Sequence, residues 1–174
     1  MGWKTLKNHF NIKHNIQVNQ CFIHIGSDYV QNLASIHLET GEIIINETFP
    51  SFLRKEYPEL FSAKPEAILE LIQAEDTFTR SIPVYTYTDD NIIEKYCEEV
   101  GFPNTTHDGV LMYNNMFSTD KDKVVKWAKR NLEAEIYILE ENIQEKEESL
   151  KKYKSMLFER KAFQDKLQAE YPNS

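Results

Sequence analysis

The chain has 174 residues, of which 41% are hydrophobic and 12% aromatic, enough to build a core in one domain or in one domain with an appendage. Its 20 basic and 28 acidic residues give a formal net charge of −8, which argues against wrapping a nucleic acid or an anionic membrane as a whole-molecule activity. No apolar run approaches the roughly 20 residues of a membrane span, and the start MGWKTLKNHF lacks the apolar stretch of a secretion signal, so we expect a cytoplasmic protein.

The N-terminal quarter predicts one short helix followed by strands. Apolar side chains recur at helical spacing at Trp3, Leu6 and Phe10. Apolar alternation over residues 15–25 then predicts a strand, and Gly26-Ser27-Asp28 supplies turn residues after it. Residues 33–47 predict two further strands joined at Thr40-Gly41. Together these segments predict a three-stranded meander.

Two short helices are expected after Pro50. Residues 51–60 and residues 64–75 place apolar side chains at helical spacing, and Pro65 lies in the first turn of the second helix, where proline is tolerated. The apolar set of this second helix is Ile68, Leu69, Leu71 and Ile72.

The next segments predict a fourth strand, a further helix and one ambiguous piece. Residues 81–88 alternate as a half-buried strand does. Asp89 or Asp90 is placed to cap a helix over residues 91–100. Residues 109–117 fit either a short fifth strand or an irregular segment. We therefore expect an α+β fold with an antiparallel sheet of four to five strands and short helices.

A single long helix is expected over residues 119–171, because this run holds no glycine and no proline. Thr119 followed by Asp122 has the form of a capping box at its start. About fifty residues at ~1.5 Å each extend about 75 to 80 Å, several times the depth of a small core. The chain therefore divides into an acidic globular domain, residues 1–118, and a long C-terminal helix, residues 119–174.

An apolar heptad along this helix predicts a coiled-coil homodimer. The first seam position holds Ile136, Ile143, Leu150 and Leu157, and the second holds Leu132, Leu139, Tyr153 and Leu167. Lys146 and Arg160 interrupt the seam, so we expect pairing of modest strength. Each buried Leu or Ile contributes about 1.5 to 3 kcal/mol, which a second copy would supply. The predicted oligomerisation residues are Leu132, Ile136, Leu139, Ile143, Leu150, Tyr153 and Leu157.

Charge blocks along the helix favour an antiparallel pair. Residues 121–130 carry five basic side chains, residues 133–148 carry seven glutamates against one lysine, and residues 151–166 carry six basic side chains. Parallel copies would set glutamate against glutamate, whereas an antiparallel pair centred near Leu150 sets the acidic block against the basic one. The alternatives are a hairpin that breaks at residues 147–149 and a helix that docks on the globular domain and frays.

Common enzyme signatures are missing: the sequence has no glycine-rich phosphate loop, no H-E-x-x-H and no G-x-S-x-G. Five glycines in all leave little room for a backbone nest around phosphate. Cys21 and Cys97 form no C-x-x-C pair, so we expect two reduced and buried thiols. We expect no cofactor and no metal.

Three smaller constellations have both a chemical and a structural interpretation. His24 and His37 fall on one face of paired strands and could begin a metal site, but no third ligand is evident, which favours solvent-facing histidines. His107-Asp108-Gly109 fits a turn better than an acid–base pair. Tyr85 and Tyr87 share a strand face and fit packing better than base stacking.

Acidic residues gather on the predicted helix over residues 91–100 and just before it. They are Asp89, Asp90, Glu94, Glu98 and Glu99, beside Glu66, Glu70, Glu75 and Asp76. A charge run is usually a solvated face. However, residues 21–118 balance 5 basic against 16 acidic side chains, so the cluster is also a candidate site for a basic partner.

The resulting hypothesis is a non-enzymatic interaction protein, dimeric through its C-terminal helix, whose acidic surface binds a basic protein and inhibits or regulates a nucleic-acid-processing enzyme. It would bind neither nucleic acid nor membrane directly. The small size, acidic domain and helical oligomerisation segment are similar in style to accessory proteins with which bacteriophages and mobile elements bind host machinery. The alternative is a small metal-dependent hydrolase or ligand-binding enzyme that uses His24, His37, His107 and Asp108.

Overall fold

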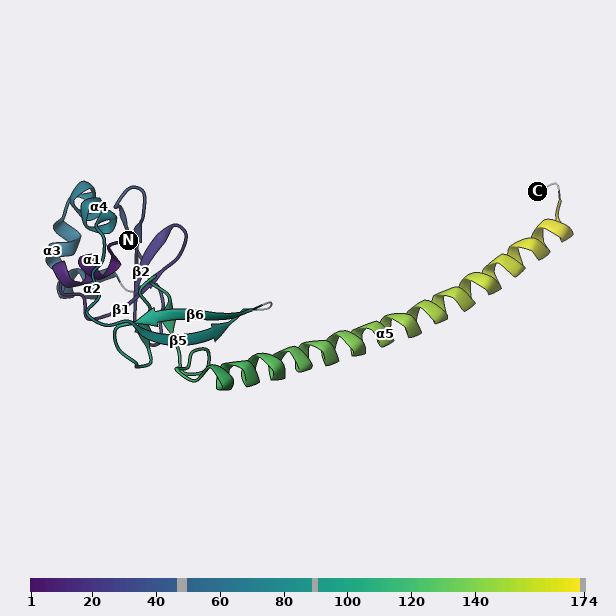
Figure 1. Cartoon of the computed structure of the whole chain (residues 1–174). Helices are drawn as coiled ribbons and strands as arrows, with labels where there is room; N and C mark the ends of the chain where they lie inside the picture. Colours follow the sequence, from purple (N-terminus) through teal and green to yellow (C-terminus); the bar gives the residue numbers. More distant parts are fainter. Residues whose placement is uncertain (47–49, 89–90, 173–174) are drawn as a thin grey trace. The chain divides into compact units, whose positions relative to one another are not determined.

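The computed structural model describes residues 1–46, 50–88 and 91–172, the side chains of Pro50 and Ser51 excepted. Its contacts separate two compact units, Met1–Lys126 and Trp127–Ser174, which we call the globular unit and the helical unit. The expected α+β fold is confirmed: a four-stranded antiparallel sheet and short helices precede a long C-terminal helix (Figure 1).

The main sheet is a four-stranded meander with strands in chain order: β1 (Asn15–Val18), β2 (Phe22–Gly26), β3 (Ala34–His37) and β4 (Ile43–Ile45). The expectation of a single strand over residues 15–25 is wrong. The Asn19 side-chain oxygen accepts backbone N–H bonds from Cys21 at 2.9 Å and Phe22 at 2.8 Å, which turns the chain between β1 and β2. This turn explains why the apolar alternation loses its phase there.

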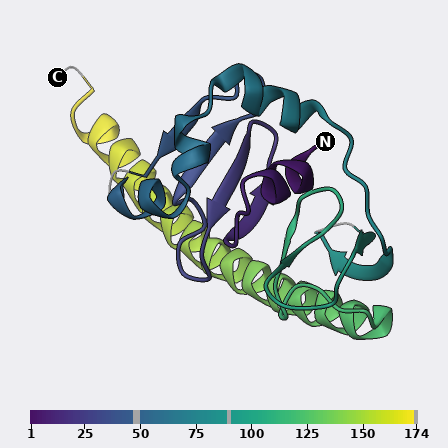
Figure 2. The same cartoon turned by 90° about the vertical axis from the view of Figure 1, so that its left-hand side faces the viewer.

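Four short helices cover one face of this sheet: α1 (Trp3–His9), α2 (Pro50–Glu56), α3 (Pro58–Ser62) and α4 (Pro65–Gln73) (Figure 2). Residues 51–60 were expected to form one helix, but Pro58 lacks an N–H and starts α3 after a break at Tyr57. The core lies between helices and strands, where Leu6, Ile23 and Leu60 are fully buried.

Asp76 fixes the start of α1. Its carboxylate accepts the backbone N–H groups of Lys4 at 3.0 Å and Thr5 at 2.7 Å, together with the Thr5 hydroxyl at 2.9 Å. These N–H groups lie in the first helical turn and have no partner within the helix.

Asp76→Ala is therefore expected to lower the free energy of unfolding by about 1 to 2 kcal/mol, the usual cost of a lost helix cap. Urea unfolding measures the change. The matched control is Glu75→Ala, which removes an exposed carboxylate beside it and should cost less than about 0.5 kcal/mol. Equal losses in both variants would contradict this role of Asp76.

A second sheet pairs β5 (Ile82–Tyr87) with β6 (Ile92–Cys97) in antiparallel register. The predicted helix over residues 91–100 is therefore wrong. Ile92, Ile93 and Tyr96 favour a strand. The acidic residues are spaced as in a helix, but the backbone pairs with β5, and this pairing determines the structure of the segment. Asp89 and Asp90, the expected caps, lie outside the described residues.

A small hairpin of β7 (Asn104–Thr105) and β8 (Leu111–Met112) follows, so residues 109–117 combine a two-residue strand with irregular chain. Its turn holds His107 and Asp108, as expected, and Gly109 has φ +87°. A Cβ at Gly109 would lie 2.2 Å from a Val18 methyl group, so only glycine fits this approach to β1.

The C-terminal helix α5 (Lys121–Glu170) is 50 residues long and continuous through residues 147–149, so the hairpin alternative is wrong. The predicted capping box at Thr119 is also wrong. Asp120 caps the helix instead, since its carboxylate accepts the Lys123 N–H at 3.2 Å. Within the described residues, none of the helices is both long and apolar enough to cross a membrane.

Candidate functional site

The predicted seam is an exposed apolar stripe on α5. In the single chain its seven predicted residues are between 46% exposed, for Ile136, and 68% exposed, for Tyr153. Leu139, Ile143 and Leu150 line a shallow hollow with the side chain of Lys146 between them. By contrast, the isoleucines at the centre of the globular unit, such as Ile23 and Ile36, are fully buried. A contiguous exposed stripe of this kind is typical of an interaction surface.

Further large apolar side chains flank this stripe. Met156 is 47% exposed and Phe163 is 56% exposed. They are seven residues apart, and each comes directly before a first seam position of the heptad. Residues 129–172 are all exposed in the single chain. The helical unit therefore has an apolar surface that its own side chains do not cover.

The charged residues of the helical unit make few contacts with one another. Among residues 127–170, all of which the structure describes, one ion pair forms, between Lys166 and Glu170 at 3.8 Å. Glutamates of the acidic block instead accept neutral bonds, as Glu141 does from the Tyr137 hydroxyl at 2.6 Å. The lysines of residues 151–161 consequently remain available to carboxylates of another molecule.

The predicted acidic cluster does not form one helix face. Glu94 lies in β6 and accepts the Tyr96 hydroxyl at 2.7 Å, while Glu98 and Glu99 follow the end of that strand. Asp89 and Asp90, the other two predicted members, lie outside the described residues. Glu98 and Glu99 lie in the bend after β6, where both line a hollow with Thr79 and Arg80.

Glu98 has a structural role in the globular unit. Its carboxylate pairs with Lys4 at 2.7 Å and accepts the Thr79 N–H at 2.7 Å and the Thr79 hydroxyl at 3.0 Å. The hydrogen bond from Lys4, followed by those from Thr79, lowers the pKa of Glu98 below its usual value. Glu98 thus ties the end of β6 to α1, which reduces its availability to a partner.

The histidines proposed for the alternative metal site are held by other contacts. His24 and His37 share a sheet face, but His24 lies opposite Ser35 and contacts it at 2.8 Å, whereas His37 lies opposite Phe22. His107 stacks on Phe78 with ring centroids 3.8 Å apart. Among the residues that the structure describes, no three His, Cys, Asp or Glu side chains are grouped to hold a metal ion.

Asp108 binds within its own turn and to β6. It pairs with Lys95 and accepts the Thr106 hydroxyl. Burial alone would raise the pKa of Asp108, but these bonds together outweigh it and lower the pKa below its usual value. This arrangement supports the turn interpretation of residues 107–109. The expectation of two buried thiols holds for Cys97, but it is wrong for Cys21, which is exposed in the turn after β1.

Tyr85 and Tyr87 share the half-buried face of β5, while Val84 and Thr86 on the other face are buried. The Lys121 ammonium lies 5.8 Å from the centroid of the Tyr85 ring. The two tyrosines therefore cover an outer face of the second sheet rather than fill its core.

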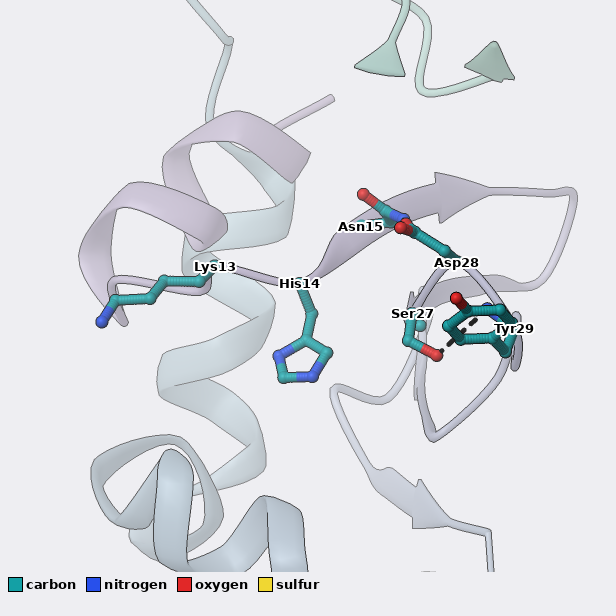
Figure 3. Close-up of a pocket in the computed structure, with 7 residues that line it drawn as sticks. Lys13, His14, Asn15, Ser27, Asp28 and Tyr29 are labelled. Atoms are coloured by element: carbon teal, nitrogen blue, oxygen red, sulfur yellow. Dashed lines mark hydrogen bonds between the residues drawn. The ribbon is translucent and has the colours of Figure 1, made fainter. Parts of the chain in front are cut away.

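A polar pocket of about 250 Å³ opens between the segment before β1 and the turn after β2 (Figure 3). Its lining residues are Lys13, His14, Asn15, Gly26, Ser27, Asp28 and Tyr29. The Lys13 side chain points away from the turn, and the Asn15 amide donates to Asp28 at 2.9 Å. The Ser27 hydroxyl accepts the N–H groups of Tyr29 at 3.3 Å and Val30 at 3.1 Å, so it shapes the turn.

His14 is bound to Tyr57 on the inner side of this pocket. The Tyr57 hydroxyl accepts the Lys13 N–H at 3.1 Å and contacts His14 Nδ1. Burial lowers the pKa of His14 below its usual value of 6.5, with Glu56 acting weakly against it. Sequence reasoning missed this pair because no spacing rule connects residues 43 positions apart.

The His14 contact predicts a loss of stability in mild acid. The folded state favours the neutral imidazole, so the unfolded state binds more protons below pH 6.5, and the free energy of unfolding falls as pH drops through this range. Urea unfolding between pH 8 and pH 5 measures the slope. His14→Gln should be less stable at neutral pH but show a smaller slope, whereas parallel profiles for both proteins would contradict the assignment.

Comparison of the chain with protein-family models, with curated proteins and with solved structures found no match.

Proposed function

We propose that this protein is a self-associating interaction protein, in which α5 pairs with α5 of a second copy as an antiparallel coiled coil. The observation that carries the proposal is the exposed seam of α5, whose predicted residues are 46% to 68% exposed in the single chain. A second copy presents the same seam, so each stripe offers the other an apolar surface of matching length.

Charge complementarity supports the second copy as the occupant of the seam. The block over residues 133–148 is acidic and the block over residues 151–166 is basic, and only an antiparallel pair sets one against the other. Each exposed pair contributes about 0.2 to 1 kcal/mol, so charge selects the orientation while the seam supplies affinity.

We also propose that the globular unit binds a basic protein, and the argument for this partner is the net negative charge of residues 1–118. Residues 1–118 hold 16 acidic and 8 basic side chains, which would steer a positively charged protein toward this unit. Glu98 is occupied by Lys4 and Thr79, so Glu99 is the described member of the cluster whose carboxylate makes no such bond. Among the residues that the structure describes, no specific contact favours the hydrolase alternative.

Dilution tests the proposal. If α5 is covered by a second copy, the helical circular dichroism signal should fall as the protein is diluted below the dimer dissociation constant, because the exposed helix loses its cover. The signal of a variant with Ile143→Asp should already be low at high concentration. A helical signal that does not change with concentration, in a protein of monomer mass, would overturn the proposal.

A further inference from the structure

We infer that the second copy binds in one defined register, in which Leu150 of each chain faces Tyr153 of the other. This inference rests on the proposed function and adds the residues that recognise one another. It starts from the heptad: in an antiparallel pair, a first seam position faces a second seam position of the partner, so the helices can shift only in steps of seven residues. Leu150 can therefore face Tyr153, Lys146 or Leu139 of the second copy, whereas facing Arg160 would set Lys154 of one chain against Lys154 of the other.

Apolar layers alone do not select among these registers. With Leu150 facing Tyr153, Ile136 faces Leu167, and Leu132 faces Tyr171, whose N–H donates to Leu167 and continues the helical turn. Ile143 then faces Arg160 and Leu157 faces Lys146, so two layers on each side of the twofold axis also set an aliphatic side chain against a basic one. With Leu150 facing Leu139, the seam has a similar number of apolar layers, but Lys129 then faces Arg160. With Leu150 facing Lys146, the central layer itself sets an aliphatic side chain against an ammonium group on each side of the twofold axis.

A charged flank separates the three registers. Its members, Glu140, Glu147, Lys154 and Lys161, recur every seven residues next to the second seam position. Residues of this flank face the same flank of an antiparallel partner. The structure shows all four on a continuous helix with no ion pair to any of them within α5.

Only one register pairs this flank without repulsion. When Leu150 faces Tyr153, Glu147 faces Lys154 and Glu140 faces Lys161, and the twofold axis repeats both pairs. When Leu150 faces Lys146, Glu147 meets Glu147 of the second copy. When Leu150 faces Leu139, Glu140 meets Glu147 twice. Like charges so close oppose association, so the flank selects the Tyr153 register.

The opposite flank fits the same register and explains two exposed apolar residues. Met156 then faces Ser149, and Phe163 faces Asn142, so each large side chain lies against a smaller one. A like-charge contact between Glu135 and Glu170 occurs at each end, where Glu170 already pairs with Lys166 of its own helix. Met156 and Phe163, which the single chain leaves exposed, are thereby covered.

This register has a consequence for the kind of assembly. Its centre lies between Lys151 and Lys152, so the two Trp127 residues, where the helical units begin, stand about 75 Å apart along the rod. The dimer then presents its two globular units at opposite ends. Such an arrangement suits a protein that bridges two separate binding sites, and not one that doubles a single contact surface.

Charge reversal tests the flank. Glu147→Lys and Lys154→Glu each place like charges opposite one another twice, so each should raise the dimer dissociation constant about tenfold. The double variant in one chain restores both pairs and should recover the original constant. If Leu150 faced Lys146, Glu147→Lys would exchange one repulsion for another and the double variant would not recover. That result would overturn the register.

Cross-linking tests the register independently of affinity. In a Cys21→Ser background, with the buried Cys97 retained, chains carrying Ser149→Cys and chains carrying Met156→Cys are mixed and treated with a short bis-maleimide. The mixture should yield cross-linked dimers, and neither variant alone should. Self-cross-linking of Ser149→Cys would indicate the Lys146 register, and no cross-link in a protein of dimer mass would also reject the inference. A monomer mass before cross-linking would instead reject the proposed function.

Discussion

Replacing Ile143 with aspartate is expected to convert the dimer into a monomer at micromolar concentration. Ile143 is 59% exposed in the single chain and lies at the first seam position, so a second copy covers it in both protomers. Loss of two buried isoleucines, at about 1.5 to 3 kcal/mol each, corresponds to a dissociation constant raised about 100-fold or more. In the inferred register each new carboxylate faces Arg160 of the second copy, and such an exposed pair offsets only about 0.2 to 1 kcal/mol of this loss. Sedimentation velocity measures the change in mass.

Ile138 provides the matched control for this substitution. It lies five residues earlier on the same helix and is 56% exposed, but it occupies an outer heptad position. Ile138→Asp should therefore leave the dissociation constant within a few-fold of the original. Equal effects of the two substitutions, or none from Ile143→Asp, would show that the seam is not the surface of association.

Replacing Ile36 with alanine should destabilise the globular unit by about 2 to 5 kcal/mol, the usual range for a core isoleucine. Ile36 lies in β3, is fully buried, and faces Ile23 of β2 and Ile43 of β4. Removal of its side chain leaves a cavity between the sheet and the helices that cover it. Urea unfolding followed by tryptophan fluorescence measures the loss, because Trp3 is buried in the same core.

Ile44 of β4 is the control, since its side chain is on the opposite face of the same sheet and is 56% exposed. Ile44→Ala should cost less than about 1 kcal/mol. If it cost as much as Ile36→Ala, that face of the sheet would be covered in the native protein, by a second copy or by another partner.

Elements with a sustained apolar period could be predicted from the sequence. The spacing of Trp3 and Leu6 indicated α1, that of Ile68 and Ile72 indicated α4, and the absence of glycine and proline indicated α5. In each of these helices, the local sequence pattern is enough to indicate the secondary structure. The exposed seam follows from the same period.

Elements that depend on a distant partner could not be predicted in the same way. Strand β6 has acids at helical spacing, but its backbone pairs with β5, and this pairing overrides the local pattern. The turn at Asn19 depends on one side-chain oxygen that accepts two backbone N–H groups. Because β6 is a strand and not the predicted helix, the acidic cluster is divided between this strand and the residues that follow it.

Contacts between residues far apart in the chain gave no signal in the sequence. Asp76 holds the start of α1, and Tyr57 holds His14, in each case across at least 43 residues. No period or motif links such pairs, because the fold alone brings them together. Glu98 is a further case, since its role in binding Lys4 was not apparent from a run of acids.

The mass of the intact chain in solution tests the central claim most directly. Sedimentation equilibrium over a concentration series around the micromolar range should show a reversible species of twice the 20.5 kDa chain mass, whose population rises with concentration. A species of 20.5 kDa at every concentration would contradict self-association through α5, and a larger closed oligomer would contradict the two-stranded pairing.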